Sequence, residues 1–222
     1  MDPLKTLLGK HVKMEISGGT TVQGVLVDFG LDIVVIYTGK EYLYVPHLHI
    51  HYIKRHTDPS FEIASPFPEV PLQEESGISY RKTLLNAKGR FVEIYVIGNK
   101  SIHGYITNVF NDYFVFYSPV YKAMLISLNH LKWLTPYQKN ITPYTLGNDV
   151  LPVQPTSLSL QRSLEEQLKK MEGQLVIFDL GDHPMKIGLL KRVQNNIAEL
   201  VTAGGDSIYW KVIHLKTVHS PS

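Results

Sequence analysis

The chain has 222 residues, of which 44% are hydrophobic and 19% charged, and this composition excludes wholesale disorder. Its 22 Lys and Arg nearly balance its 20 Asp and Glu, so no overall attraction to nucleic acid or to acidic membranes is expected. The count of Cys is 0, which excludes disulfides, thiolate nucleophiles and thiolate zinc sites.

Neither a membrane span nor a signal peptide is predicted. No apolar run approaches the roughly 18 residues that a membrane helix needs. Residues 1–5 do not lead into the apolar stretch of a signal peptide. We therefore expect no membrane partner and no export by the usual secretion signal.

The first predicted unit, residues 1–57, begins with a short helix. Asp2 can cap this helix, Pro3 suits its first turn and Gly9 can end it. Residues 11–16 then alternate between polar and apolar side chains, which predicts a half-buried strand.

Two glycine positions shape the rest of this unit. Ser17-Gly18-Gly19 predicts a hairpin turn, because glycine tolerates a positive φ. Gly24 lies inside the next strand, where a glycine usually marks a bulge or a sharp bend. We interpret Gly24 as the corner at which a short five-stranded sheet bends to close a small barrel.

The predicted linkers, residues 58–79 and 136–162, differ in composition from the units that they join. Both are rich in proline, and residues 58–79 carry five acids and no Lys or Arg. Residues 80–135 carry seven Lys and Arg against two acids. One hypothesis is that the acidic linker covers this basic unit and masks an RNA surface; the alternative is two independently solvated segments.

The second and third predicted units, residues 80–135 and 163–222, repeat the first. Each has a helix before its first glycine, and Ser163 and Glu166 have the spacing of a capping box. In the third unit the alternation runs through Val176, Phe178 and Leu180, and a turn is predicted at Leu180-Gly181-Asp182. The recurring positions are Gly9, Gly89 and Gly173; Gly24, Gly104 and Gly188; Asp32, Asp112 and Asn196; and the closing His49, His130 and His214. We predict an all-β protein of three tandem five-stranded small barrels with short N-terminal helices.

A helix followed by five strands with a Gly-x-Leu start resembles the Sm-like barrel of the Sm and Hfq proteins. Gly24-Val25-Leu26 carries the likeness, which implies an SH3-type barrel fold and suggests RNA binding. The uridine-contacting Asn of Sm proteins corresponds here to Val34, Phe114 and Ala198, and the base-stacking aromatic of Hfq corresponds to Asp32, Asp112 and Asn196. An acid repels a phosphate backbone, so we keep RNA binding only as the alternative function.

The triple repeat also resembles the spore outer-coat protein B family of Bacillus-type spore formers. The likeness rests on Gly24-Val25-Leu26, Asp112-Tyr113, the Tyr-rich residues 41–44 and the closing residues 130–134. Longer members of that family end in a Ser/Lys/Arg-rich tail that this chain lacks. The resemblance implies a structural component of the spore coat, made in the mother-cell cytoplasm, whose partners are other coat proteins.

Assembly is expected to use strand edges, since small barrels leave edge strands that can pair with neighbours. Three barrels could form half of a six-barrel ring, which makes a homodimer a specific alternative to a monomer. Surface Tyr would help such contacts and could allow oxidative cross-linking, although strand propensity also explains them. The Tyr residues considered are Tyr42, Tyr44, Tyr113, Tyr117 and Tyr121.

Two sets of His are the remaining candidates for a site. His47, His49 and His51 alternate, which would place three imidazoles on one face of a strand and suit Zn, Cu or Ni, but a solvated strand face is the favoured interpretation. His49, His130 and His214 are expected to donate structural hydrogen bonds. Gly204-Gly205-Asp206 is predicted to be a turn, and no motif predicts an enzyme, a cofactor site or a metal site.

Overall fold

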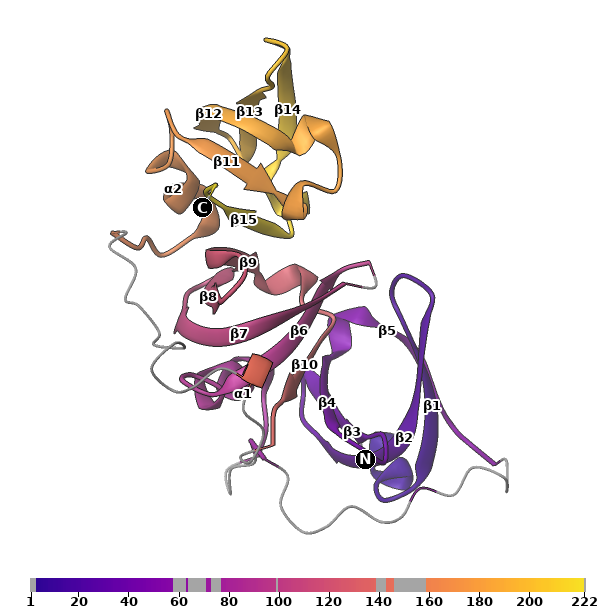
Figure 1. Ribbon diagram of the computed structural model, residues 1–222. Coiled ribbons are helices and arrows are strands. Elements are labelled where there is room, and N and C mark those ends of the chain that lie inside the picture. Colours follow the sequence, from indigo (N-terminus) through magenta and orange to yellow (C-terminus); the bar gives the residue numbers. More distant parts are fainter. Residues whose placement is uncertain are drawn as a thin grey trace.

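The computed structural model describes residues 3–57, 63, 71–72, 77–98, 100–138, 143–145 and 159–221. Its strands form one antiparallel sheet of fifteen strands, which confirms the prediction of an all-β fold (Figure 1). The sheet order is β14-β13-β12-β11-β15-β9-β8-β7-β6-β10-β4-β3-β2-β1-β5. Within the described residues, no helix is both long enough and apolar enough to cross a membrane.

Three blocks of five strands make up this sheet. In the direction given above, each block has its strands in the order fourth, third, second, first, fifth. Block 1 contains β1 (His11–Ile16), β2 (Thr20–Phe29), β3 (Ile33–Tyr37), β4 (Tyr42–Pro46) and β5 (Ile50–Arg55). Block 2 contains α1 (Tyr80–Asn86), β6 (Phe91–Ile97), β7 (Lys100–Val109), β8 (Tyr113–Ser118), β9 (Lys122–Ser127) and β10 (Trp133–Pro136). Block 3 contains α2 (Leu164–Lys169), β11 (Leu175–Phe178), β12 (Ile187–Gln194), β13 (Ile197–Val201), β14 (Ser207–Lys211) and β15 (Thr217–His219).

The predicted helices precede the blocks. Ser163 caps α2, because its hydroxyl accepts a hydrogen bond from the amide of Glu166, as the capping-box spacing predicts. Ser79 caps α1 in the same way. The first helix, Pro3–Leu7, is a 3-10 helix rather than an α-helix. Pro136, which was predicted to open the second linker, is the last residue of β10.

The glycines inside the second strand of each block allow two strands to approach closely. A Cβ atom at Gly24, Gly104 or Gly188 would collide with the backbone carbonyl oxygen of the neighbouring third strand, at Tyr37, Tyr117 and Val201 respectively. Each of these strands has a register shift a few residues further on, which bends the sheet. This contact fits the interpretation of these glycines as corners.

The first hairpin of block 3 differs from the prediction. Its strand ends at Phe178, so Leu180 is not part of the alternation, and two 3-10 turns replace the predicted tight turn. The reason is Asp179, which is buried and accepts hydrogen bonds from the amides of Lys216 and Thr217 at 2.7 and 3.1 Å. Lys186 neutralises this carboxylate at 2.8 Å. The predicted turn at residues 204–206 is present between β13 and β14.

A substitution in block 3 tests the corner interpretation. Gly188→Ala should lower the free energy of unfolding by about 1–3 kcal/mol, because the added methyl group meets backbone that cannot move aside. Gly204→Ala is the matched control, since its Cβ would meet nothing closer than 3.7 Å. Urea unfolding of both variants measures the difference, and equal stabilities would contradict the interpretation.

Candidate functional site

The candidate functional site consists of the two junctions at which one block pairs with the next. β4 of block 1 pairs with β10 of block 2, with Tyr44 opposite Leu134. β9 of block 2 pairs with β15 of block 3, with Leu125 opposite Val218. Tyr44 and Leu125 occupy the same place in their blocks, because each lies opposite the third residue of the third strand, Val35 or Val115. The fourth strand of one block therefore joins the fifth strand of the next in one repeated register.

Apolar side chains of blocks 1 and 2 complete the core of the block that follows each of them. Ile33, Val35 and Tyr44 of block 1 belong to the buried cluster that fills block 2. Tyr113, Val115 and Leu125 of block 2 belong in the same way to the cluster of block 3. Burial of several large side chains at each junction stabilises it by several kcal/mol, so neighbouring blocks are packed together rather than independent of one another.

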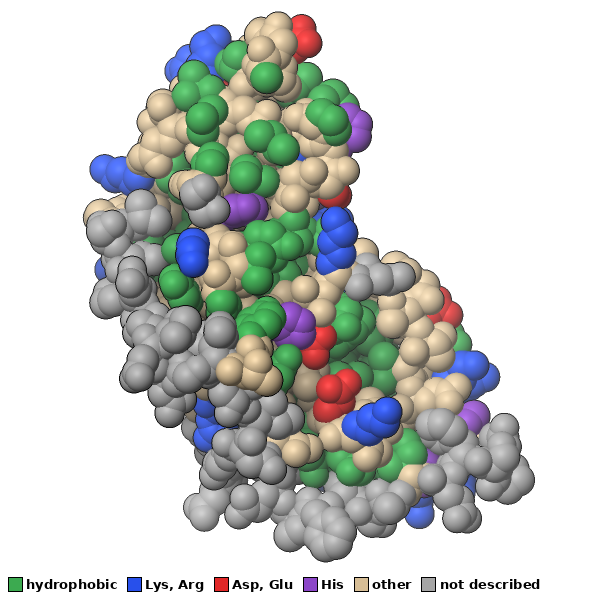
Figure 2. Space-filling view, in the orientation of Figure 1, with side chains coloured by type: hydrophobic (Ala, Val, Ile, Leu, Met, Phe, Trp, Pro, Cys, Tyr) green, Lys and Arg blue, Asp and Glu red, His purple; other side chains and the backbone are tan. Residues whose placement is uncertain are grey.

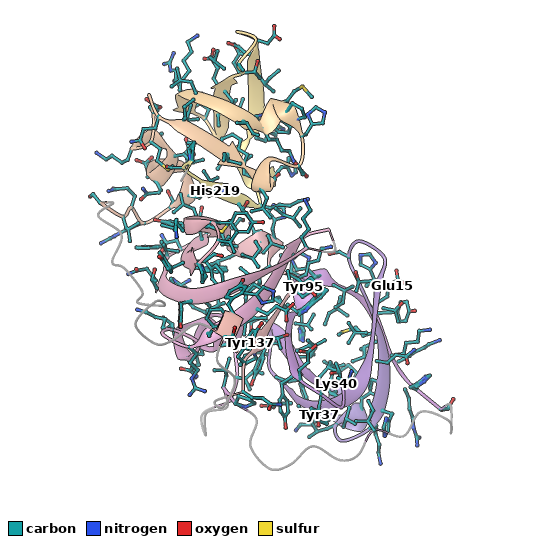
Figure 3. All side chains as sticks on the ribbon, viewed as in Figure 1. Glu15, Tyr37, Lys40, Tyr95, Tyr137 and His219 are labelled. Carbon is teal, nitrogen blue, oxygen red and sulfur yellow. The ribbon has the colours of Figure 1, made fainter. Side chains whose placement is uncertain are left out.

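Packing also runs in the opposite direction across the first junction. Trp133 of β10 is buried within the core cluster of block 1. Its ring stacks on Tyr95 at a centroid distance of 4.1 Å, and Figure 3 places Tyr95 near the boundary between these blocks. Leu72, which lies between the predicted units, is buried at this junction, where its amide donates to the Tyr44 hydroxyl at 3.0 Å.

The recurring acids hold the helix of the next block. Asp32 accepts a hydrogen bond from the amide of Tyr80 at 2.8 Å, at the start of α1. Asp112 accepts one from the amide of Leu164 at 2.9 Å, at the start of α2. A carboxylate at a helix start satisfies a free amide and is favoured by the helix dipole. The sequence alone identifies these acids only as positions that cannot stack on a base, although their recurrence ahead of each following helix is a signal of the capping role.

Two of the three recurring His residues lie at the junctions. His130 of block 2 bonds the carbonyl oxygen of Ile213 in block 3 at 2.8 Å. His49 of block 1 is buried and bonds the Ser17 hydroxyl through Nδ1 at 2.9 Å. Burial lowers the pKa of His49, and the carbonyl of Asn129 in block 2 lies near enough to oppose this lowering in part, although Nε2 makes no hydrogen bond of regular geometry with the described residues. The predicted structural role holds for His49 and His130, whereas His214 is exposed.

The proposed arrangement of three His on one strand is wrong. His47 and His49 belong to a 3-10 helix, and only His51 lies in β5, where its Nδ1 is 3.3 Å from Glu15. A 3-10 turn does not place alternate residues on one face. Among the described residues, no group of three His, Asp or Glu side chains is arranged to hold a metal ion.

The positions that would bind uridine in Sm proteins face the interior. Val34, Phe114 and Ala198 are fully buried, and each belongs to the apolar core of its own region. Asp32 and Asp112 are occupied as helix caps. Figure 2 shows Lys and Arg scattered over the visible face rather than gathered into a stripe. The described residues therefore offer no Sm-type base pocket at these positions.

Burial removes two Tyr residues from the predicted surface set. Tyr44 and Tyr113 are buried at the two junctions, and burial raises the pKa of Tyr113 to about 12. The Tyr113 hydroxyl donates to the carbonyl of Gln161 at 2.6 Å. The pattern of alternation could not reveal this, because a strand face that would meet solvent in a single block meets the next block here.

A polar network lies on block 2 beside the first junction. The hydroxyl of Ser101 is 3.1 Å from Nε2 of His103, and the hydroxyl of Tyr137 is 2.9 Å from Nδ1 of the same ring. Glu93 of β6 lies opposite His103. Burial raises the pKa of Glu41, and the negative charge of Glu93 raises it further. Ser101 and His103 lie two residues apart on β7, and polar side chains that lie close together commonly satisfy one another in this way, so we interpret the group as structural.

The predicted acidic cover concerns the first linker. The acids of residues 58–79 lie outside the described residues, so the cover stays a hypothesis. Next to this linker, Arg90 donates a hydrogen bond to the carbonyl of Pro71 at 2.9 Å.

A pocket of about 360 Å³ opens at the second junction and is lined by Asp112, Asn129, Ser163 and Asn196 among others. Asp112 and Ser163 already accept hydrogen bonds from α2, so we interpret this pocket as part of the junction rather than as a ligand site.

Comparison with known proteins places the chain in a family. It is 51% identical to the uncharacterized protein YwrJ of Bacillus subtilis (strain 168) over 228 aligned positions, which cover 100% of both chains. The chain belongs to the YwrJ family. A family model described as the YwrJ third domain matches residues 163–218, a range that begins at the cap of α2.

The caps across the junctions can be tested at Asp112. Asp112→Ala should lower the free energy of unfolding by about 1 kcal/mol, because the amide of Leu164 loses its acceptor. Asp112→Asn should retain most of the stability, since block 3 itself carries Asn196 at this place and an amide oxygen also accepts. Equal losses in both variants, measured by urea unfolding, would contradict a capping role.

Acid should weaken both junctions. Burial lowers the pKa of His49, with further lowering by His130 and Lys132, and burial also lowers the pKa of His219, which lies between blocks 2 and 3 (Figure 3). Protons then bind the unfolded chain more readily, so stability should fall as the pH drops below the ordinary His value of 6.5.

Urea unfolding at pH 7.5 and pH 5.5 measures this loss. The loss should be smaller in the double variant His49→Gln with His219→Gln. The matched control is His183→Gln, which removes an exposed imidazole from the first hairpin of block 3 and should leave the loss unchanged. An undiminished loss in the double variant would show that other groups cause the pH dependence.

Proposed function

We propose that this protein is a non-enzymatic structural component of the bacterial spore coat, built to associate with other coat proteins through the edges of small β-barrels. The observation that carries the proposal is the repeated pairing of fourth and fifth strands, which joins separate blocks into one sheet of fifteen strands. A chain that already assembles its own blocks edge to edge has the means to recruit further edges.

Three other observations support the proposal. The relative in Bacillus subtilis comes from a spore-forming genus, and the triple repeat resembles the outer-coat protein B family. The recurring Asp and His residues, which are the natural candidates for chemistry, are engaged in contacts between blocks. The protein would be made in the mother-cell cytoplasm and deposited on the forespore.

A localisation experiment tests the proposal. A fluorescent fusion of the full chain, expressed in sporulating Bacillus subtilis, should outline the forespore and remain with purified spores until coat proteins are extracted. The fluorescent protein alone is the control and should stay in the mother-cell cytoplasm. A diffuse fusion that is lost on spore release would overturn the proposal. Purified protein with a high 260/280 nm absorbance ratio, caused by bound RNA, would favour the alternative instead.

A further inference from the structure

The two ends of the sheet carry the strand edges that a third junction would use. β14 is the fourth strand of block 3 and β5 is the fifth strand of block 1, and these are the terminal strands of the sheet order. Each of the other fourth strands, β4 and β9, is paired with the fifth strand of the next block. β14 and β5 therefore each carry an edge that has no strand partner among the described residues.

Equivalent positions define the register that a third junction would have. Tyr209 of β14 lies opposite Glu199, the third residue of β13, and so takes the place of Tyr44 and Leu125. Ile53 of β5 lies opposite Met14, just as Leu134 lies opposite Ile94. Since Tyr44 faces Leu134 and Leu125 faces Val218, the same register places Tyr209 opposite Ile53.

Side chains on the free face of block 3 are exposed where their equivalents are buried. Tyr209 is 66% exposed, against 2% for Tyr44 and 4% for Leu125. Ile197 is 40% exposed, although its equivalents Ile33 and Tyr113, which each open the third strand, are almost fully buried. Figure 2 shows further hydrophobic side chains on the visible surface of block 3. Such exposed apolar groups beside an open strand edge mark an interaction surface.

Block 1 offers the matching surface. Tyr52 lies beside Ile53 in β5 and is 40% exposed, whereas Trp133 beside Leu134 is buried in the core of the preceding block. In the third junction Tyr52 would lie opposite Trp210, whose indole already borders the core of block 3. An aromatic ring would thus enter block 3 in the manner in which Trp133 enters block 1.

The recurring His supplies an independent polar contact. His130 bonds the carbonyl oxygen of Ile213, which is the middle residue of the 3-10 turn in the next block. His214 is the equivalent of His130 in block 3 and is exposed. The equivalent of Ile213 in block 1 is Leu48, the middle residue of the turn His47–His49, and its side chain is 66% exposed. His214 and the Leu48 carbonyl are thus the donor and acceptor of a junction that a single chain cannot make.

We propose that β14 of one copy pairs with β5 of a second copy in the register of the internal junctions, with Tyr209 opposite Ile53 and His214 at the carbonyl of Leu48. The three blocks form a bent row in Figure 1, so head-to-tail pairing curves back, and two copies close a ring of six blocks. This inference rests on the proposed function and deepens it, since it names a second copy of the chain as the first partner of the strand edges.

The third junction should be weaker than the internal two. Glu199 takes the place of the buried Val35 and Val115, and Lys191 and Ser207 hold its carboxylate at 2.8 and 3.0 Å. A charged group at the centre of an interface costs desolvation, so association is expected to be reversible and to depend on concentration. A reversible junction suits a protein whose copies stay apart at low concentration and associate where they accumulate.

Charge exchange across the junction is the decisive experiment, read by sedimentation of the purified full chain over a range of concentrations. The native chain should reach twice the monomer mass. Tyr209→Lys and Ile53→Glu should each weaken dimerisation at least tenfold, because an unpaired charge faces an apolar partner. An equimolar mixture of the two variants should restore dimers, since Lys then faces Glu across one junction and the other junction is native.

The control variant is Leu175→Lys, which places the same charge at an exposed apolar position of block 3 outside the free edge and should dimerise normally. A native chain that stays monomeric, or a dimer that the edge variants do not weaken, would overturn the proposal. Open chains of more than two copies that the same variants dissolve would support the pairing and overturn the closed ring.

Cross-linking checks the register. Because the chain has no Cys, a mixture of Ile53→Cys and Tyr209→Cys carries one thiol per copy. Oxidation should join these two chains into a disulfide-linked heterodimer at least tenfold more than it joins Ile53→Cys with Ser207→Cys, which lies two residues out of register. Equal yields would contradict the register. These measurements are made in solution, so they hold or fail independently of whether the protein reaches the spore coat.

Discussion

The architecture depends on hydrogen bonding between the fourth strand of one block and the fifth strand of the next. A sheet edge presents unpaired amides and carbonyls, and leaving them buried without partners would cost more than the net gain from making the bonds. Here the next block satisfies them at β4 and β9. The pairing brings outward-facing side chains such as Val35 and Val115 under the next block, so the hydrophobic core continues from block to block.

Polar contacts then select one geometry for an attachment that apolar packing alone would leave loosely defined. A carboxylate at the start of a helix and an imidazole at a carbonyl have narrow requirements for distance and direction. Asp32 and Asp112 meet them at α1 and α2, and His130 does so at Ile213. Each contact joins residues far apart in the sequence. The repeat therefore includes its means of attachment, and its most regular polar positions serve that purpose.

The two ends of the sheet differ from its interior in the side chains that they present. The free face of block 3 retains Tyr209 and Ile197 but carries Glu199 where the internal blocks have Val. A fully apolar end would promote uncontrolled association, whereas a fully polar end would be a simple cap. The observed mixture suits a surface that pairs reversibly, as the proposed third junction requires.

The sequence alone determined the all-β class, the three repeats and most local elements, because these follow from short-range patterns. Alternation predicted the strands, Ser163 and Glu166 predicted the start of α2, and the glycines at 24, 104 and 188 marked places where a side chain cannot fit. Only the tertiary structure decided which faces meet solvent. In a single block, Tyr44 and Tyr113 would be surface residues, and the three alternating His would lie on one strand. The neighbouring blocks bury the two Tyr residues, and a 3-10 turn removes two of the His from the strand. The buried Asp179 likewise replaces the predicted hairpin turn of block 3. Those features arise from backbone turns or from contacts between residues tens of positions apart, such as the 37 positions between Asp179 and Lys216, and a local pattern of polar and apolar residues carries no record of either.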